Sequence, residues 1–238
     1  MWQALRAELH PKGVEIVTVA LDTGGADAAR PFIEAASPEH PSLIDQAHVS
    51  DELFGFVNVP MAVWIDEEGT LVRPAYAAHV QHSPLRDSPI PDDLEGPLRD
   101  LLTEVKKIRT NVDDHLAALR DWAEHGSASR FALSPDEVVA RSQPRSRDQA
   151  RAAACFELGQ HLWRTGDRDA AVPWFREAHR LDPNNWTYKR QAWTFATTPD
   201  GQPSDLMQGP TDLYEGNWLD DVRRLGAENY YPLEDFSA

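Results

Sequence analysis

The sequence predicts a mixed α/β unit followed by an all-helical region. A run of β-branched residues at 14–22 lies between turn residues, which is typical of a buried strand. A Val-Pro pair at 59–60 precedes two short apolar runs joined by Glu-Glu-Gly, the pattern of a β-hairpin. Beyond residue 92, apolar residues recur at steps of three or four, the period of an amphipathic helix.

The first unit is expected to alternate strands and helices. The strand at 14–22 is predicted to be central, because nearly all its residues are apolar or β-branched. A helix at 26–36 follows, and Pro31 limits it to a short or kinked one. The remaining elements are a strand at 41–45, a short helix at 50–56 capped by Ser50, a strand at 61–66 and its partner at 70–74.

Helices make up the remainder. Residues 83–97 are predicted to be a loop, and the stripe from Leu94 to Val112 indicates one amphipathic helix. Asn111 is a candidate cap for the next helix, and Ser134 with Pro135 begins another at 134–141. The predicted units are an α/β domain at 1–90, connecting helices at 91–146, a helical region at 147–200, and a C-terminal arm at 201–238. A polar linker marks the boundary between the connecting helices and the helical region. The arm is expected to contain a short helix that ends at Gly226.

The charge, hydropathy and cysteine content of the chain indicate which partners and which cellular compartment to expect. With 23 Lys and Arg against 39 Asp and Glu, the formal charge is −16, so no basic face is expected for nucleic acid or an anionic membrane surface. No apolar run is long enough to span a membrane, and the first residues lack the apolar core of a signal peptide. The single cysteine, Cys155, excludes an internal disulfide and a CxxC pair. We therefore expect a cytoplasmic protein.

Four pieces of residues 1–74 resemble the thioredoxin-like fold, especially the TlpA-type thiol–disulfide reductases and the thiol-specific peroxidases. They are HPKGVEIVTVALD, PSLID, FGFVNVP and WIDEEGTLV, in that order. In that family the proline of the Val-Pro pair is cis and faces the redox centre, and the residue before it pairs its backbone with an extended substrate. The resemblance thus implies that Val59 and Pro60 line the substrate site. The open alternative is a structural turn that merely starts a strand.

The redox residue of that family has no counterpart in this chain. The family carries CxxC, or a single peroxidatic cysteine, at the N-terminus of its first helix, where the helix dipole stabilises a thiolate. Residues 1–9 align with later turns of that helix. The resemblance implies a redox residue upstream of residue 1, so no catalytic residue is assigned here. If that residue is selenocysteine, its codon resembles a stop, and a reading frame would restart at the next methionine, where Met1 stands.

An absent first strand has a physical consequence. In the thioredoxin sheet that strand lies between the strand at 14–22 and the hairpin, so two rows of backbone N–H and C=O groups would lose their partners, which is costly. Three outcomes are open: the flanking strands close up, another segment or subunit inserts a strand, or the chain lacks its natural N-terminus. We favour the third.

Residues 152–185 resemble one tetratricopeptide repeat, a helix–turn–helix of about 34 residues. Gly159, Ala171 and Ala178 fall at the family's marked positions, where small side chains let the two helices approach. Phe175 is expected to fill the space between them.

A single repeat cannot bury both its faces, so neighbouring helices are required. The segment 185–196 would supply one, with Trp186 and Trp193 packed against Phe175 or Leu181. The connecting helices could flank the other side. A packing or capping role is favoured over a peptide groove, because grooves usually need several repeats.

Other candidate sites are weaker. His79 and His82 could share a metal, but no third ligand is evident, so no metal is predicted. Gly24-Gly25 precedes a helix without the Lys-Ser/Thr of a phosphate loop or the dinucleotide spacing, so no cofactor is predicted. Cys155 lies on a helix face directed to a core and is expected to be an inert thiol.

Two functional hypotheses follow. The first is a thiol or selenol oxidoreductase that reduces a disulfide or a peroxide, whose redox residue lies upstream, so that residues 1–238 are inactive alone. The second is a non-catalytic scaffold or adaptor that binds protein through the cis-proline edge or the helical region. The expected partners are a protein thiol or disulfide, or a small peroxide, with no nucleic acid and no membrane. The oligomeric state stays open, including a homo-oligomer.

Overall fold

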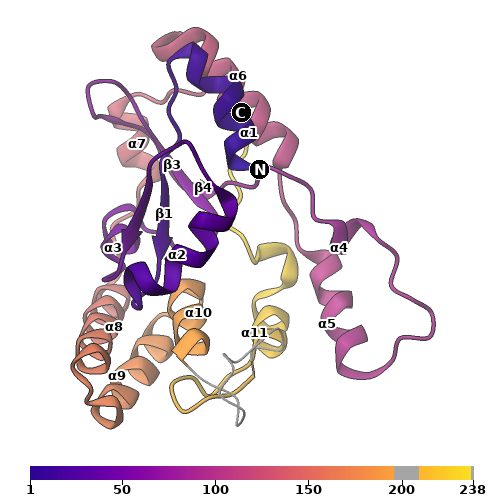
Figure 1. Cartoon of the computed structure of the whole chain (residues 1–238), viewed down its shortest axis with the longest axis vertical. Coiled ribbons are helices and arrows are strands. Elements are labelled where there is room, and N and C mark those ends of the chain that lie inside the picture. Colours follow the sequence, from indigo (N-terminus) through magenta and orange to yellow (C-terminus); the bar gives the residue numbers. More distant parts are fainter. Residues whose placement is uncertain (196–208, 237–238) are drawn as a thin grey trace.

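The computed structural model describes residues 1–195 and 209–236, which form a strand-bearing half and a helical half (Figure 1). A mixed α/β class with a helical region is thus confirmed. Residues 196–208, which include the end of the predicted helix at 185–196 and the start of the predicted arm, lie outside the described residues, as do 237–238.

Four short strands form two separate pairs rather than one sheet. β1 (Thr18–Leu21) runs parallel to β2 (Ser42–Asp45). β3 (Met61–Ile65) runs antiparallel to β4 (Leu71–Ala77), which is longer than the strand predicted at 70–74. Within the described residues, β1 and β3 are not hydrogen-bonded to each other. The flanking strands have therefore not closed up.

The strand predicted at 14–22 is shorter and more exposed than expected. Only the four residues of β1 form a strand, and Val17 and Val19 are 51% and 41% exposed. In the part of the chain that the structure describes, β1 has a hydrogen-bonded neighbour on one edge alone. The prediction of a buried central strand is wrong here, because burial requires neighbours that cover the strand on all sides.

Three helices belong to the strand-bearing half: α1 (Trp2–Leu9), α2 (Gly25–Ala36) and α3 (Val49–Phe54). α2 continues through Pro31 instead of ending there. Pro31 has no N–H to donate to the carbonyl of Asp27, and both residues are exposed, so this position of the helix tolerates proline.

The helix predicted from Leu94 to Val112 is interrupted. α5 (Gly96–Lys107) ends before Ile108, whose backbone is extended, and α6 (Val112–His125) begins after Asn111. The two helices bury their apolar faces in different places, which explains the break. Leu101 and Val105 of α5 pack on the helical half, whereas Trp122 of α6 stacks on Trp64 of β3 at 4.9 Å.

Two shorter helices flank this pair. Part of the loop predicted at 83–97 forms α4 (Pro84–Asp87). α7 (Pro135–Arg141) begins after the N-cap Ser134, as its sequence predicts, and Ser134 and Glu137 form a capping box in which each satisfies the other's backbone N–H group. Single turns of 3-10 helix lie at His10–Lys12, Gly126–Ala128 and Ala227–Asn229.

The helical half is centred on the hairpin of α8 (Arg147–Thr165) and α9 (Arg168–Leu181). Gly159 lies on α8 where an added Cβ would sit 3.2 Å from the ring of Phe175, so glycine allows the close approach of α9. The chain turns at Gly166, whose φ of 91° favours glycine.

Two further helices complete this core. They are α10 (Trp186–Phe195) and α11 (Trp218–Leu225), the latter ending at Gly226 as predicted. The ring of α10 that contacts Phe175 is Phe195, at 5.7 Å between centroids. Trp193 instead packs on Tyr214, and Trp186 packs on Tyr230. The rings on which the two tryptophans pack come from the segments before and after α11, and both tryptophans share one buried core with Phe175.

The extended arm after α11 ties the two halves together. The backbone N–H of Ala77 donates to the carbonyl of Pro232 at 2.8 Å, which confirms an arm packed on the body. Glu234 pairs with the buried guanidinium of Arg73 and with Arg141. Phe236 then enters the core beside Tyr76.

Among the helices of the described residues, none combines the length and the apolar character that crossing a bilayer requires.

Candidate functional site

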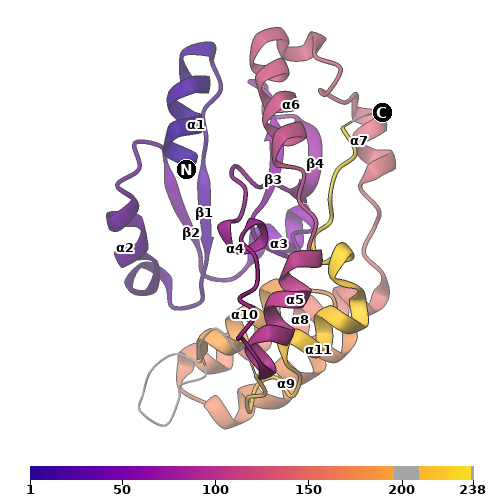
Figure 2. The same ribbon diagram turned by 90° about the vertical axis from the view of Figure 1, so that its right-hand side faces the viewer.

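The two strand pairs stand apart, with β1 and β2 on one side and β3 and β4 on the other (Figure 2). A groove of about 550 Å³ is lined by residues of both pairs. We call it the strand groove. It runs between β1 and β3, and its walls are mostly apolar. Its lining includes Ile16, Val19, Phe56, Val63, Trp64 and Leu119.

Each wall of the strand groove is an open strand edge. β1 pairs only with β2, and β3 pairs only with β4, within the described residues. An open edge presents a row of peptide N–H and C=O groups that a further strand can pair with. The groove is therefore shaped and equipped to take one extended segment of chain.

A buried polar chain lies against the strand groove. The indole N–H of Trp64 donates to the hydroxyl oxygen of Tyr76 at 2.7 Å, and that oxygen lies 2.9 Å from Nδ1 of His115. Since the Tyr76 oxygen already accepts from Trp64, its proton is donated to Nδ1, and neutral His115 carries its own proton on Nε2. Nε2 is buried without a partner in the described residues.

The imidazole of His115 is held neutral. It lines the strand groove, yet the residue is only 1% exposed. Burial, and then the nearby His79, lower the pKa of His115 to about 4. At neutral pH the groove therefore contains a buried N–H donor that carries no charge.

Val59 and Pro60 lie at one end of the strand groove, and the peptide bond between them is cis. The turn is held from both sides. The side chain of Asn58 donates to the carbonyl of Tyr230 at 3.0 Å and accepts from the N–H of Val59 at 2.9 Å. The carbonyl of Val57 accepts from the backbone N–H at the start of α10 at 2.6 Å. Val59 itself is 37% exposed.

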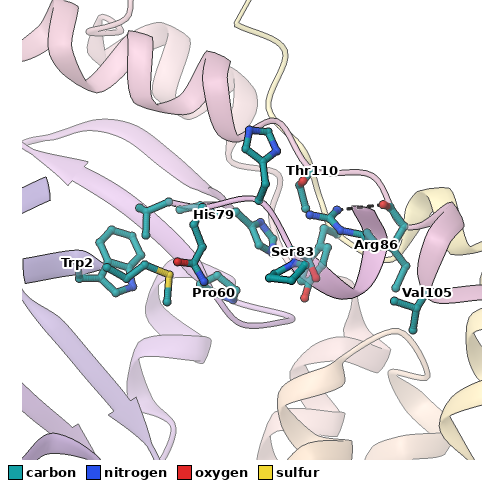
Figure 3. A pocket seen from close by; sticks show the side chains of 15 residues that line it. Trp2, Pro60, His79, Ser83, Arg86, Val105 and Thr110 are labelled. Atoms are coloured by element: carbon teal, nitrogen blue, oxygen red, sulfur yellow. Dashed lines mark hydrogen bonds between the residues drawn. The ribbon is translucent and has the colours of Figure 1, made fainter. Parts of the chain in front are cut away.

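A second cavity, of about 340 Å³, adjoins Pro60 on its other side, and we call it the cis-proline pocket. Figure 3 shows Trp2 and Pro60 at one side, Arg86, Thr110 and Val105 at the other, and His79 and Ser83 between them. Its walls come from the first turn of α1, the segment after β4, α4, α5 and the arm. Pro60 is common to both cavities.

The two halves meet at a buried polar interface. The amide nitrogen of Gln160 on α8 lies 2.7 Å from the hydroxyl of Thr23 and 2.8 Å from Nδ1 of His48. The N–H of Thr23 donates to the side-chain oxygen of Gln191 at 2.9 Å. Burial lowers the pKa of His48 to about 4. This contact occupies one face of the α8–α9 hairpin.

Asp51, in α3, lies with its carboxyl group buried in the same interface. It is 4% exposed, and neither carboxylate oxygen has a partner in the described residues. The neighbouring hydroxyl of Thr187 donates to the side chain of Asn185 instead, at 2.5 Å. Burial raises the pKa of Asp51 to about 8, so the group is mainly protonated at neutral pH.

The remaining candidates do not form sites. His79 lines the cis-proline pocket, whereas the exposed His82 lies 3.2 Å from Asp113. Among the described residues, no group of three or more His, Cys, Asp or Glu is arranged to hold a metal. Cys155 is buried in α8, and burial raises the pKa of its thiol. It lines neither cavity.

The sequence analysis named Val59 and Pro60, which line the strand groove, but it did not identify the polar groups around them. His115 follows Val112 by three residues and precedes Leu119 by four, so helical periodicity alone puts it on the buried face of α6. That signal was present. Arg86 and His79 come together only because α4 and α5 fold back over the segment after β4, and no local pattern indicates this.

Comparison with known proteins supports one part of the chain. Residues 152–185 match the tetratricopeptide repeat family, and these residues include most of the α8–α9 hairpin. No curated protein and no solved structure matches the chain. Residues 152–185 are thus a tetratricopeptide repeat, which stands next to a strand-bearing half that contains an open groove.

Proposed function

We propose that this chain is the larger part of a thioredoxin-like thiol or selenol oxidoreductase that reduces a disulfide or a peroxide. Its redox residue belongs to a segment upstream of residue 1. The single observation that carries the proposal is the strand groove, which separates two strand pairs and ends at a cis Val59–Pro60 bond.

The groove supports this proposal through its place in the fold. By the resemblance, the first core strand belongs between the strand that contains β1 and the hairpin of β3 and β4. That is where the open groove lies. A strand inserted there would pair with both open edges and cover the apolar residues that line them. It would run parallel to β1, because strands joined by a helical crossover in one sheet are parallel.

The position of α1 supports the same proposal. Trp2, in the first turn of α1, lines the cis-proline pocket together with Pro60. One or two earlier turns of the same helix would bring a residue to the proline. A thiolate or selenolate at such a helix N-terminus is stabilised by the helix dipole.

In the proposed reaction the upstream thiolate or selenolate attacks one sulfur of the substrate disulfide, and the other sulfur leaves as a thiolate. A second thiol of the same upstream segment then attacks the mixed disulfide and displaces the substrate, so the enzyme ends with one internal bond and the substrate with two thiols. An external dithiol then reduces the enzyme again. Val59 and Pro60 would hold the extended substrate. A reducing, cytoplasmic compartment is part of this proposal.

The decisive experiment restores the upstream codons. About a hundred preceding nucleotides would encode roughly 33 residues, which is more than the typical length of one strand and one helix together. We expect an in-frame Cys codon or TGA within a thioredoxin-type motif, and turnover of insulin disulfides or hydrogen peroxide by the extended chain with dithiothreitol as reductant.

Residues 1–238 alone are the matched control and should show no turnover, since Cys155 is buried away from both cavities. Robust turnover by residues 1–238 would contradict the assignment of the redox residue. An extended chain that folds but stays inactive would contradict the enzyme proposal altogether.

The tetratricopeptide repeat favours a second candidate, a protein-binding scaffold. Such repeats commonly mediate protein interactions, through surfaces formed by stacked repeats. Here α10 and the buried interface with Thr23 and His48 already cover parts of the hairpin. A scaffold would therefore bind through the outer surface of α9, where Trp174 is 39% exposed. Loss of a co-purifying protein in a Trp174→Ala variant, with redox activity absent, would support it.

A further inference from the structure

The cis-proline pocket differs in charge from the chain as a whole. The protein has a formal charge of −16, yet no Asp or Glu among the described residues lines this pocket. The one formally charged side chain in its lining besides the histidines is Arg86. A positive group placed in a cavity that excludes acidic residues favours an anionic ligand.

Arg86 is held in place for such a role. Its Nη1 donates to the carbonyl of Ile108 at 3.1 Å, which Figure 3 marks, and its own carbonyl accepts from Lys106 at 2.8 Å. In the part of the chain that the structure describes, the bond to Ile108 is the one hydrogen bond that the guanidinium of Arg86 donates. Donors on the guanidinium thus stay available for a ligand.

His79 adds a polar group without adding charge. Burial, and then Arg86, lower the pKa of His79 to about 4, so its imidazole is neutral at neutral pH. Its Nδ1 is buried without a partner in the described residues, and its ring packs edge-on against Tyr231 at 4.3 Å. The pocket therefore combines one cationic side chain, one imidazole nitrogen without a partner in the described residues, and apolar walls.

We propose that the cis-proline pocket binds a carboxylate of the protein substrate, an acidic side chain close to the disulfide that is reduced. Guanidinium groups bind carboxylates through paired, charge-assisted hydrogen bonds. The apolar residues Pro60, Ala78 and Ile108 limit water around that pair, and the volume admits one side chain. The assignment to a redox substrate rests on the proposed function, whereas carboxylate binding itself does not.

The first experiment uses residues 1–238 and two acetylated, amidated peptides, SVDVS and SVNVS, which differ only in the carboxylate. Binding is followed by NMR through the His79 imidazole and the Arg86 side-chain N–H signals. We expect the Asp peptide to bind about tenfold more tightly than the Asn peptide, since a charge-assisted hydrogen bond is stronger than a neutral one. High salt should reduce the difference.

Arg86→Gln should abolish the preference for the Asp peptide. Arg86→Lys keeps the positive charge and should retain part of the preference, which shows that the loss in Arg86→Gln is not due to misfolding. Arg109→Gln removes the same charge from an exposed residue nearby and should keep the full preference. Equal affinity for both peptides, or equal loss in Arg109→Gln and Arg86→Gln, would overturn the inference.

A second arm separates this inference from the proposed function. The extended chain is assayed with two disulfide-linked peptides, one with Asp and one with Asn beside the cystine. Preferential turnover of the Asp peptide that Arg86→Gln removes supports both. Turnover without preference contradicts the carboxylate assignment alone, and peptide preference without turnover contradicts the redox function alone.

Discussion

The helical half and the strand-bearing half differ in how completely they satisfy their own backbone. In the helical half each helix makes its hydrogen bonds internally, and Phe156, Phe175 and Trp193 share one buried core. In the strand-bearing half β1 and β3 each have one edge without a strand partner in the described residues, and these edges face a groove of about 550 Å³.

This difference follows from the chemistry of the two kinds of element. An exposed helix face needs only apolar cover, which any neighbouring helix supplies. Accordingly α10, α11 and α5 complete a core around a single repeat. A strand edge needs another backbone in register. The helical half is therefore complete within the described residues, and the strand-bearing half is the place where a further segment would bind.

Acidification should have the largest effect on stability, because buried histidines lie in both halves. Burial lowers the pKa values of His48, His79, His115 and His179 to about 4 each. Below about pH 6.5 the unfolded chain takes up protons that the folded chain does not, so stability falls as the pH drops towards about 4, by roughly 2–3 kcal/mol per fully buried histidine.

We therefore expect cooperative unfolding near about pH 5 in a circular-dichroism titration. His48→Gln should move the midpoint to lower pH, whereas His125→Gln, on an exposed side chain, should not. A midpoint unchanged by His48→Gln would contradict the role of the interface.

Removing the central aromatic ring of the helical half should have the next largest effect on stability. Phe175 is fully buried and contacts the rings of Phe156, Trp163 and Phe195. Phe175→Ala should lower the free energy of unfolding by about 3–5 kcal/mol in urea denaturation. Trp174→Ala, on the neighbouring and half-exposed residue, should cost far less. If the strand-bearing half stays folded when the helical half melts, two transitions will separate.

Removing the buried acid should stabilise the contact between the halves. The folded chain keeps Asp51 protonated up to about pH 8, whereas the unfolded chain ionises near about pH 4, so stability is lost as the pH rises through this window. Asp51→Asn should raise the free energy of unfolding at neutral pH by roughly 2–4 kcal/mol.

The gain from Asp51→Asn should vanish near about pH 4, where both states of the wild-type residue are protonated. Asp92→Asn, at an exposed position, serves as the control and should leave thermal stability unchanged. A pH-independent gain would mean that packing, rather than protonation, is responsible.

The smallest expected effect concerns the capping box of α7. Ser134 accepts from the N–H of Glu137, and the carboxylate of Glu137 accepts from the N–H of Ser134 at 2.8 Å. Ser134→Ala should cost about 1 kcal/mol of stability. Ser142→Ala, at the other end of α7, should cost less, and calorimetry would separate the two.

Sequence reasoning succeeded where local patterns decide the structure. The hairpin predicted at 61–66 and 70–74, the N-cap at Ser134 and the repeat at 152–185 depend on turn residues, caps and helical periodicity. The cis bond at Val59–Pro60 agrees with what the resemblance implied. The domain boundaries and the roles of these two residues stay predictions.

The predictions that were wrong or absent concern contacts between elements that are distant in the sequence. The strand at 14–22 was expected to be buried, but burial depends on a partner that the described residues do not provide. The stripe from Leu94 to Val112 was continuous in sequence, yet its two parts serve different cores. Arg86 and His79 meet only through the tertiary packing of α4 and α5, so the cis-proline pocket was not foreseeable.

The arm that follows α11 has a consequence for how the protein is made. Asn58, Arg73 and Ala77, all near the start of the chain, bond to Tyr230, Glu234 and Pro232. Because these partners lie far apart along the chain, the strand-bearing half cannot complete the three contacts until the arm has been synthesised. Without the arm, the buried guanidinium of Arg73 would lose the carboxylate of Glu234.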